Sequence, residues 1–247
     1  MAEKFYYDLH IHSCLSPCGD EDMTPNNIAG MAVLKGLNVL ALTDHNTCKN
    51  CPAFFEACKK QGLIAIAGVE VTTSEDVHMI CLFRTLDDAM DFDRDLQDYR
   101  ILIKNEEDIF GSQLIMDGED NVVGREEHLL VNATTLDIET LSEFAAQHRA
   151  LVYPAHIDRE ANGIVSVLGT LPITPEFSAY EFHFGDKINE YKEKFKLLES
   201  KPLVVSSDAH FLWDINEAEN CFWLEIDKYS SDIVREKIFS YLSGEKV

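Results

Sequence analysis

Two histidines stand one residue apart near the start of the chain, at the end of an apolar run. Residues 6–25 read YYDLHIHSCLSPCGDEDMTP, so His10 and His12 are followed closely by Cys14, Cys18 and Asp20. Residues two apart in a β-strand point to the same side of it. We therefore expect His10 and His12 to share one metal ion, and the loop after them offers further ligand groups.

Other metal-binding residue types stand at the ends of other apolar runs. Seven of the nine histidines fall at the edges of predicted strands, and Asp208 and His210 repeat the spacing of His10 and His12. The full set is His10, His12, Asp44, His45, Glu70, His78, His156, His183, Asp208 and His210. The carboxyl ends of barrel strands meet on one face, so we expect these side chains to converge there.

The chemistry of this set is that of a hydrolytic metal site. Imidazole and carboxylate ligands without dominant thiolate suit Zn²⁺, Mn²⁺ or Fe²⁺. The set exceeds what one ion needs, which predicts two or three divalent ions. A carboxylate such as Glu70 can bridge two of them. A hydroxide between the ions would then attack phosphorus while the ions hold the phosphoryl oxygens.

The elements that must carry these residues alternate between strands and helices. Thr24 is the expected N-cap of the first helix, with Pro25 at its first position, and Asp137 caps a later one. Continuous apolar strands separated by helices predict a parallel or mixed sheet that is covered on its outside. Strands are predicted at residues 4–12, 38–45, 63–73, 78–83, 151–157, 179–184, 202–210 and 220–226, and helices at 24–37, 52–62, 137–150, 187–200 and 230–244.

Residues 85–135 break this rhythm. Residues 86–110 predict one long acidic helix, and residues 113–124 predict a hairpin with Asp117 and Gly118 in its turn. We interpret the stretch as an insertion or subdomain within a single domain that spans residues 1–247. Long segments on a barrel face often shape substrate choice, so we expect this one to lie over the site.

Composition limits the classes of partner and location. The chain has 247 residues and a net charge of −23, and this acidity disfavours long nucleic acid and favours a small phosphorylated substrate. The chain shows no 18-residue apolar run and no signal peptide, which predicts a cytoplasmic protein without a membrane partner. No oligomeric state follows from the sequence.

Seven cysteines allow a second kind of site. Their odd number and the cytoplasmic expectation favour free thiols over disulfides. Cys14 and Cys18 follow the first strand, whereas Cys48 and Cys51 follow the second. If these loops meet, the four thiols could bind Zn²⁺ or form a redox pair. The simpler interpretation is free thiols packed under the loops.

Five ordered stretches carry a resemblance to a known family. They are DLHIHS at 8–13, LTDHN at 42–46, GVEVTT at 68–73 with His78 after it, PAH at 154–156 and SSDAH at 206–210. With them the chain resembles, from residue 5 to about 225, the PHP (polymerase and histidinol phosphatase) family of metal-dependent phosphoesterases. The resemblance implies a distorted (β/α)7 barrel with its metal site at the C-terminal ends of the strands.

The resemblance also implies a division of the ligands among three ions. It gives the first ion His10, His12, Glu70 and Asp208, the second Glu70, His78 and His156, and the third His45, His210 and one ligand from the loop after strand one. Asp44 would orient a ligand or that loop, or else cap the next turn. Asp208, His210 and His183 are the expected catalytic residues.

The last ligand of the third ion is where this sequence departs from the family. Relatives often carry an aspartate five residues after the second histidine or a histidine six after it, but here these positions are Pro17 and Cys18. Counting back from Thr24 and Pro25 instead places Asp20 there. Both remain candidates, with a slight preference for Asp20. A thiolate from Cys18 would favour Zn²⁺ or Fe²⁺ over Mn²⁺.

The substrate side needs groups that bind phosphate oxygens. Arg159 is the first candidate, and Arg125, Lys104 and Arg149 are weaker ones. His183 could contact substrate or protonate the leaving group. The leading hypothesis is hydrolysis of small phosphomonoesters such as nucleotide or sugar phosphates. The alternatives are a phosphodiesterase or nuclease acting on short or cyclic nucleotides, and a non-catalytic module stabilised by metal.

Overall fold

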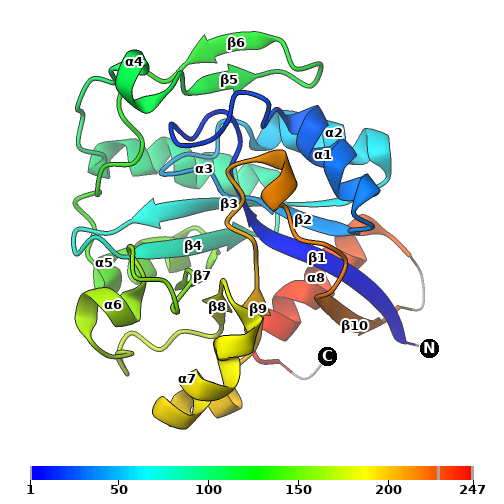
Figure 1. Cartoon of the computed structure of the whole chain (residues 1–247), viewed down its shortest axis with the longest axis vertical. Coiled ribbons are helices and arrows are strands. Elements are labelled where there is room, and N and C mark those ends of the chain that lie inside the picture. Colours follow the sequence, from blue (N-terminus) through cyan, green and yellow to red (C-terminus); the bar gives the residue numbers. More distant parts are fainter. Residues whose placement is uncertain (1, 227–228, 246–247) are drawn as a thin grey trace.

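The computed structural model describes residues 2–226 and 229–245 and shows an α/β fold built on a curled sheet (Figure 1). Six strands form this sheet in the order β10-β1-β2-β3-β4-β7, while β5 pairs with β6 and β8 pairs with β9. The strands are β1 (Ala2–Ile11), β2 (Val39–Leu42), β3 (Ile64–Thr72), β4 (His78–Phe83), β5 (Leu114–Met116), β6 (Val122–Arg125), β7 (Leu151–Pro154), β8 (Tyr180–Phe182), β9 (Leu203–Val205) and β10 (Cys221–Glu225).

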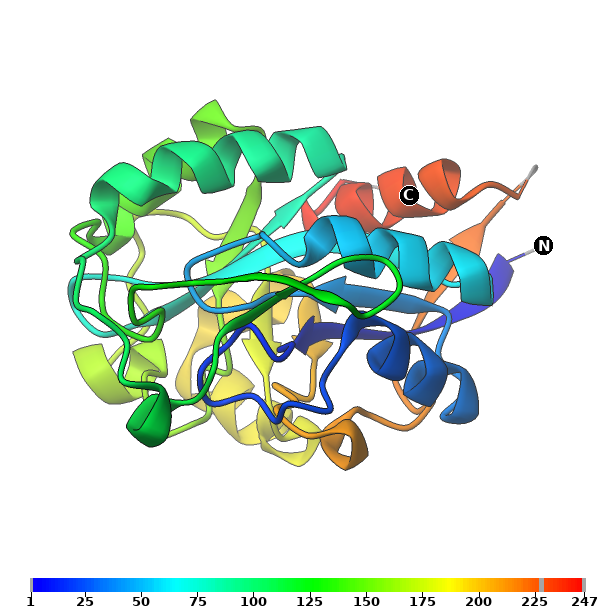
Figure 2. The ribbon, with the colours of Figure 1, turned by 90° about the horizontal axis from the view of Figure 1, so that it is seen from above.

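Helices cover this sheet and fill the connections between its strands (Figures 1 and 2). The α-helices are α1 (Pro25–Leu34), α2 (Cys51–Gln61), α3 (Leu86–Leu96), α4 (Glu107–Phe110), α5 (Ile138–Gln147), α6 (Ile164–Leu168), α7 (Ile188–Lys194) and α8 (Ser231–Leu242). Short 3-10 turns are η1 (Gln97–Tyr99), η2 (Gly185–Lys187), η3 (Lys196–Ser200) and η4 (Leu212–Asp214). Among the described residues, no helix is long and apolar enough to span a membrane.

The predicted starts of α1 and α5 are confirmed. The side chain of Thr24 accepts a hydrogen bond from the amide of Asn27, and Pro25 is the first residue of α1. Asp137 accepts the corresponding bond from the amide of Thr140 at 2.7 Å. These side chains satisfy amides that the first turn of a helix leaves without a partner.

The sheet is mixed, and its strand ends gather the site. β1 pairs in parallel with β2, and β2 with β3, whereas β4 is antiparallel to both β3 and β7. The carboxyl ends of β1, β2, β3 and β7 therefore lie at the same edge as the start of β4. This arrangement explains how His78 joins the site from the first position of its strand.

The β8–β9 pair stands between β7 and β1 and is joined to them by few backbone bonds. The amide of Ile157, after β7, donates to the carbonyl of Glu181 in β8 at 2.9 Å. The amide of His12 donates to the carbonyl of Ala209, after β9, also at 2.9 Å. The α/β class is confirmed and the main sheet is a half-barrel; the count of seven βα units stays a prediction.

Alternation along β3 places the central acid of the site. Ala65, Ala67 and Val69 belong to one apolar core, whereas Ile64 and Ile66 belong to a second core into which α8 packs. Because side chains alternate with period two, Glu70 lies on the same side as Ile64 and Ile66, at the carboxyl end of the strand. It is fully buried.

The single long helix predicted at residues 86–110 is wrong. Helix α3 ends at Leu96, the turn η1 follows, and Arg100 is extended with φ −75° and ψ 138°. Arg100 pairs with Glu126 at 3.1 Å and its backbone bridges Thr134, so tertiary pairing overrides helix propensity here. Helix α3 itself packs on the sheet through Ala89 and Phe92.

Two smaller differences concern the later helices. The helix predicted at 187–200 divides into α7 and η3, because Phe195 is extended (φ −125°, ψ 92°) and packs against the core. The short helix α6 was not predicted at all. The predicted hairpin in the 113–124 stretch is present as β5 and β6, with Asp117 and Gly118 in the connection.

The chain between α3 and α5 lies over the loops that follow β1 and β2 (Figures 1 and 2). The amide of Leu114 donates to the carbonyl of Cys14 at 2.9 Å. The side chain of Asn50 donates to Ser13 Oγ and to the carbonyl of Leu114, both at 3.0 Å. These bonds fix the segment against the site loops; its interpretation as an insertion stays a prediction.

Candidate metal centre

Three overlapping groups of side chains at the carboxyl edge of the sheet could each hold a metal ion. Within each group the ligand atoms lie within 4.8 Å of one another. Glu70 belongs to two of the groups, and so do His12 and His45, so the groups form one continuous centre. They are His10, His12, Glu70 and Asp208; His45, Glu70 and His78; and His12, His45 and His210.

Glu70 is the carboxylate that contacts the histidines of several ligand groups. Its Oε1 lies 2.8 Å from His78 Nδ1 and 3.1 Å from His156 Nε2. Its Oε2 lies 3.1 Å from His45 Nδ1 and 3.3 Å from His12 Nε2. One carboxylate thus contacts imidazoles from both sides, which is the geometry a bridging ligand requires.

The ring of His10 is oriented by a buried acid. His10 Nδ1 donates to Glu181 Oε1 at 2.7 Å, so His10 Nε2 faces Asp208 and Glu70, 3.3 Å from an oxygen of each. Glu181 Oε1 also accepts the amide of His156 at 3.1 Å. A carboxylate behind a ligand histidine fixes its tautomer and its orientation.

The ring of His12 is oriented by a relay through a serine. Ser16 Oγ donates to Asp44 Oδ1 at 2.7 Å and therefore accepts from His12 Nδ1 at 2.9 Å. This turns His12 Nε2 towards the centre, 3.0 Å from His10 Nε2. Asp44 also accepts from the amide and the hydroxyl of Ser13 at 2.7 and 2.6 Å. Hydrogen bonds of this kind are what Asp44 needs to orient the ring of His12 and the loop after β1.

His210 presents its ring in the same way. Its Nδ1 donates to the backbone carbonyl of Asp208 at 2.9 Å, which leaves Nε2 free. Burial and the neighbouring His12 lower the pKa of His210 to about 3, so the ring is neutral near pH 7. A neutral imidazole with a free nitrogen is the form that binds metal.

The electrostatics show how much charge is concentrated here. Burial disfavours the ionised form of Glu70, but the facing His78, His10 and His45 outweigh it and hold its pKa well below the usual range. Burial likewise opposes protonation of His12, and the carboxylates of Asp208 and Glu70 overcome it and raise the pKa to about 9. Without metal, the carboxylates thus stay ionised and part of the imidazole set takes up protons instead.

Unpartnered atoms show that a cation fits this centre. His45 Nδ1, Glu70 Oε2 and Asp208 Oδ1 are buried and have no hydrogen-bond partner. Buried polar atoms without partners are rare and costly. All three atoms belong to the ligand groups, and His45 Nδ1 and Glu70 Oε2 lie 3.1 Å apart, as two ligands of one ion would.

Two residues at the metal centre, His156 and Asp208, adopt an unusual backbone conformation. His156 has φ +25° and Asp208 has φ +53°, a region that residues with a side chain seldom adopt. Such strain persists only where the surrounding structure enforces it, and it clusters at functional sites. Bonds around Asp8 supply part of that enforcement: its carboxylate accepts the amides of Ser207 and Asn216, each at 3.0 Å.

The ligand groups agree in part with the expected division of ligands among the ions. The first expected set, His10, His12, Glu70 and Asp208, coincides with one group. His156 contacts Glu70 but falls outside the groups, whereas His45 stands in the group where His156 was expected. The assignment of residues to individual ions remains a proposal.

The two candidates for the last ligand behave differently. Asp20 Oδ1 accepts the amide of Asp22 at 2.9 Å, so this carboxylate caps its own turn. The Cys18 side chain is exposed. Burial and His12 oppose protonation of His45, and Glu70 and Cys18 outweigh them and raise the pKa of this ring to about 9. The choice between Cys18 and Asp20 as a ligand remains a proposal.

The four-cysteine site does not form within the described residues, whose metal groups include no cysteine. Cys48 and Cys51 are buried, with their Sγ atoms 3.4 and 3.6 Å from the carbonyl of Gly68. Cys14 packs with Leu114 in a small separate core. The thiols that follow strands one and two are therefore not brought together.

Two cavities open onto the metal centre. One of about 130 Å³ is lined by Glu70, His78 and His156, and one of about 590 Å³ is lined by His183 and Phe211. Arg159, Asp208 and His210 line both cavities. Arg159 forms an ion pair with Asp208, so its guanidinium lies beside a candidate ligand of the metal centre.

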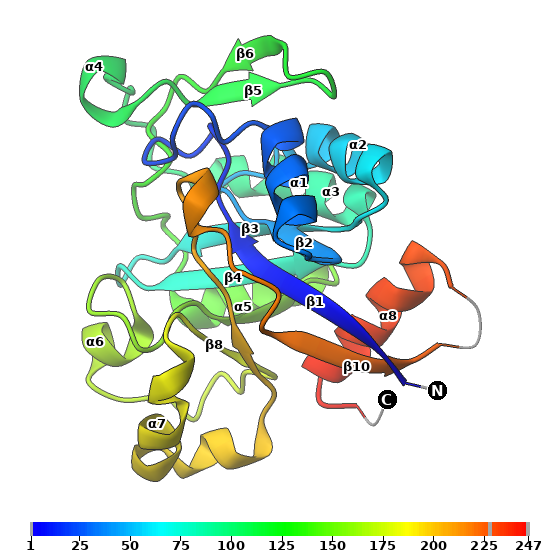
Figure 3. The same ribbon diagram turned by 45° about the vertical axis from the view of Figure 1, so that its right-hand side comes forward.

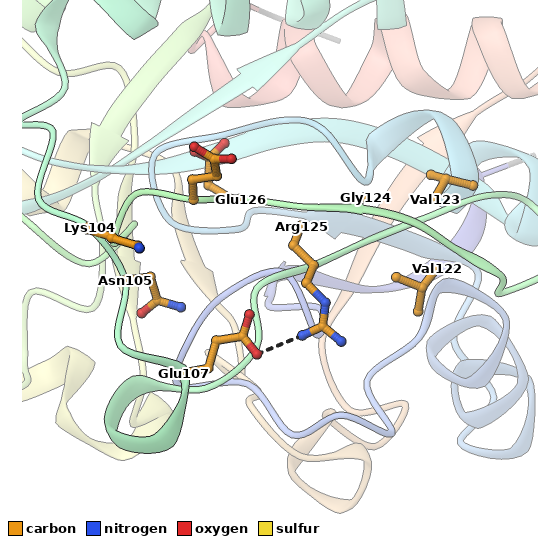
Figure 4. A pocket seen from close by; sticks show the side chains of 9 residues that line it. Lys104, Asn105, Glu107, Val122, Val123, Gly124, Arg125 and Glu126 are labelled. Atoms are coloured by element: carbon orange, nitrogen blue, oxygen red, sulfur yellow. Dashed lines mark hydrogen bonds and ion pairs between the residues drawn. The ribbon is translucent and has the colours of Figure 1, made fainter.

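A third cavity, of about 640 Å³, lies away from the ligands between β6 and residues 104–107 (Figure 4). Its cations are Lys104 and Arg125, and Arg125 is paired with Glu107 at 2.9 Å. These two weaker phosphate candidates thus lie outside the metal centre. Arg149 is paired with Asp88 and is not among the residues lining the two cavities of the centre.

Sequence reasoning missed the residues that hold the ligands in place. Glu181, Asp8 and Ser16 are buried and contact His10, Ser207 and His12 respectively. A usable signal existed for the two acids, because each stands alone in an apolar strand, two residues from a histidine. Ser16 gave no such signal, since serine is common in loops.

The fold and site together define an α/β protein with a histidine and carboxylate metal centre at its strand ends. The PHP domain family matches residues 8–156, and the chain belongs to this family. A 5'-3' exoribonuclease of Haemophilus influenzae is 37% identical over 79 residues, which cover 31% of this chain and 28% of that protein. The chain thus matches less than a third of the length of this curated relative.

Solved structures agree on the fold. A Bifidobacterium adolescentis protein assigned as a metal-dependent phosphoesterase has a TM-score of 0.60 and 16% identity, covering 100% of this chain and 99% of that chain. The lesion-specific endonuclease Q of Pyrococcus furiosus has a TM-score of 0.65 and 20% identity, covering 98% of this chain and 56% of that chain. At the level of the family, the predicted class of metal-dependent hydrolase acting on phosphate esters is confirmed.

One prediction about partners is wrong. The net charge of −23 predicts that long nucleic acid is disfavoured, yet a similar structure is endonuclease Q in complex with a 27-mer duplex, and a similar sequence is an exoribonuclease. Net charge is a property of the whole surface, whereas screening limits a charge to about 8–10 Å at physiological salt. The net charge of the chain therefore does not decide what a local site accepts.

Proposed function

We propose that this chain hydrolyses phosphodiester bonds of nucleotides or nucleic acids at a centre of two or three divalent metal ions. The observation that carries the proposal is the sharing of Glu70 between two ligand groups, with His12 and His45 linking both to a third. The similarity to an exoribonuclease and to an endonuclease supports this substrate class over others.

The metals would supply a nucleophile at neutral pH and would bind the phosphoryl oxygens. The chain supplies the positioning. Glu181 and Ser16 hold the rings of His10 and His12, and Arg159 lies at the junction of the two cavities, where its guanidinium can bind a non-bridging oxygen.

His183 is the candidate proton donor to the leaving oxygen. Its Nδ1 has no hydrogen-bond partner, and its ring lines the 590 Å³ cavity next to Asp208. Asp158 fixes this strand end by accepting the amides of His183 and Phe184 at 2.8 and 2.7 Å. An imidazole held in the wall of this cavity is a candidate for proton transfer to the leaving oxygen.

For the third-site ligand we propose Cys18, because Asp20 Oδ1 already accepts the amide of Asp22 and the Cys18 side chain contributes to raising the pKa of His45. A thiolate among imidazoles would favour Zn²⁺ or Fe²⁺ in that position.

A second candidate function is hydrolysis of small phosphomonoesters. The cavity bounded by Glu70, His78 and His156 measures only about 130 Å³, which suits a terminal phosphoryl group. The two candidates differ in whether a diester is a substrate.

The test compares bis-p-nitrophenyl phosphate, p-nitrophenyl phosphate and 5'-labelled single-stranded RNA and DNA, with metal-stripped and metal-restored protein. We expect metal-dependent cleavage of the diester and of at least one oligonucleotide, and a loss of at least 1,000-fold in Asp208→Asn. Asp98→Asn, an exposed carboxylate in η1, is the matched control and should not change the rate. Turnover of the monoester alone would replace the proposal with the second candidate. Metal binding without turnover of any substrate would support the non-catalytic module.

A further inference from the structure

The 590 Å³ cavity lies beside the metal centre. It shares Arg159, Asp208 and His210 with the smaller cavity at the ligands, so the two cavities adjoin. Its volume falls within the range of about 300–1,000 Å³ typical of small-molecule sites. A group attached to a phosphate at the metals would extend directly into it.

An exposed aromatic ring forms one wall of this cavity. Phe211 follows the ligand candidate His210 directly in sequence and is 46% exposed. Its backbone is extended (φ −131°, ψ 150°), and its carbonyl accepts the amide of Asp214 at 3.0 Å as η4 begins. This loop lies beside the loop after β1, where the amide of Asp20 donates to the carbonyl of His210 (Figures 1 and 3).

Polar residues also line this cavity, and His183 and Asn216 are among them. The ring of His183 contacts that of Phe184, with centroids 4.4 Å apart and planes at 85°. The backbone amide of Asn216 donates to Asp8 at 3.0 Å, which fixes the residue. The cavity thus combines an aromatic face with polar side chains in its wall.

We propose that this cavity binds the nucleoside of the substrate, with the base stacked on Phe211. The inference rests on the proposed function, because it places the phosphate at the metal centre. Every base has a flat face, so an aromatic platform accepts nucleotides with little sequence preference.

Stacking contributes to affinity independently of contacts to the phosphate backbone. Stacking on a neutral ring needs no positive surface and is worth roughly 10- to 100-fold in affinity for each base. We therefore expect recognition of one nucleoside next to the cleaved bond, with weak dependence on salt.

The experiment uses two diesters with the same leaving group. Thymidine 5'-(p-nitrophenyl phosphate) carries a nucleoside, and methyl p-nitrophenyl phosphate carries none. We expect the wild-type chain to prefer the nucleoside ester by about 10- to 100-fold in kcat/KM. Phe211→Ala should reduce this preference about 10-fold through KM, Phe211→Leu should reduce it similarly, and Phe211→Tyr should retain it.

A binding measurement supports the kinetics independently of turnover. 2-Aminopurine riboside 5'-monophosphate loses fluorescence when its base stacks, and we expect quenching with wild type and Phe211→Tyr but not with Phe211→Ala. Trp223→Ala, which removes another exposed aromatic side chain on β10, is the control and should change neither readout.

The outcomes separate the inference from the proposed function. Hydrolysis of both esters without a nucleoside preference, or a preference that Phe211→Ala leaves intact, overturns the inference and spares the proposed function. Absence of all hydrolysis overturns the proposed function. In that case the fluorescence measurement decides the inference: quenching that Phe211→Ala removes supports it, and quenching that Phe211→Ala leaves unchanged overturns it.

Discussion

Glu181 should control the affinity of the metal centre without touching a metal. Its Oε1 accepts two bonds, from His10 Nδ1 at 2.7 Å and from the amide of His156 at 3.1 Å, and both donors are buried. Removing the acceptor frees the His10 ring to rotate and leaves two donors without partners. Each unsatisfied buried donor costs about 1–3 kcal/mol.

Loss of a partner that orients a ligand histidine typically weakens metal binding by about 10- to 100-fold. Glu181→Gln keeps an amide oxygen for both donors but loses the charge, so we expect the lower end, about 10-fold. Glu181→Ala loses the acceptor and its volume, so we expect about 100-fold, together with a lower melting temperature of the metal-free protein.

The assay is a competition titration of metal-stripped protein against a fluorescent Zn²⁺ chelator, with circular dichroism to verify folding. Glu176→Gln is the matched control, since Glu176 is exposed and pairs only with Lys201 at the surface. Folded Glu181→Gln and Glu181→Ala proteins that both bind Zn²⁺ within threefold of wild type would refute the orienting role. If Glu181→Ala does not fold, the Gln variant alone decides.

Two further predictions concern the loop after β1 and the segment above it. With Co²⁺ in place of the native metal, we expect a thiolate-to-cobalt charge-transfer band that disappears in Cys18→Ser and persists in Asp20→Asn; the opposite pattern would restore Asp20 as the ligand. Burial opposes ionisation of Glu126, but Arg100 and Lys49 outweigh it and lower its pKa to about 2. Its folded pKa lies below the ordinary value of 4.5, so its stabilisation is complete above pH 4.5 and is lost as the pH falls towards 2. The pKa shift of Glu126 alone corresponds to ~3 kcal/mol of unfolding free energy. We expect Glu126→Gln to cost about 2 kcal/mol at neutral pH, because solvent reaches the ion pair with Lys49 and weakens it. By urea denaturation this difference should shrink to less than half at pH 3, and a difference independent of pH would contradict the assignment.

Local signals in the sequence determined much of the fold. The starts of α1 and α5 follow from Thr24 and Asp137, because capping uses groups within four residues. The helix predicted at 86–110 failed at Arg100, whose partners Glu126 and Thr134 lie far along the chain. Propensity carries no information about such distant pairing.

The sequence alone determined which residues could form the site. Spacing by two placed His10 and His12 together, and the strand-end positions of Glu70 and Asp208 selected them as further ligands, because the alternation of a strand is a property of the backbone. A ligand motif at a strand end can therefore be identified from residue types and spacing.

Only the tertiary structure decided how these residues are held and what lies beside them. Glu181 stands 171 residues from His10, and the two are brought together because β8 lies between β7 and β1. The preference for Cys18 over Asp20 depends on the course of one loop, and the cavity at Phe211 depends on how the chain turns after β9. These features come from packing between distant segments, which sequence spacing does not record.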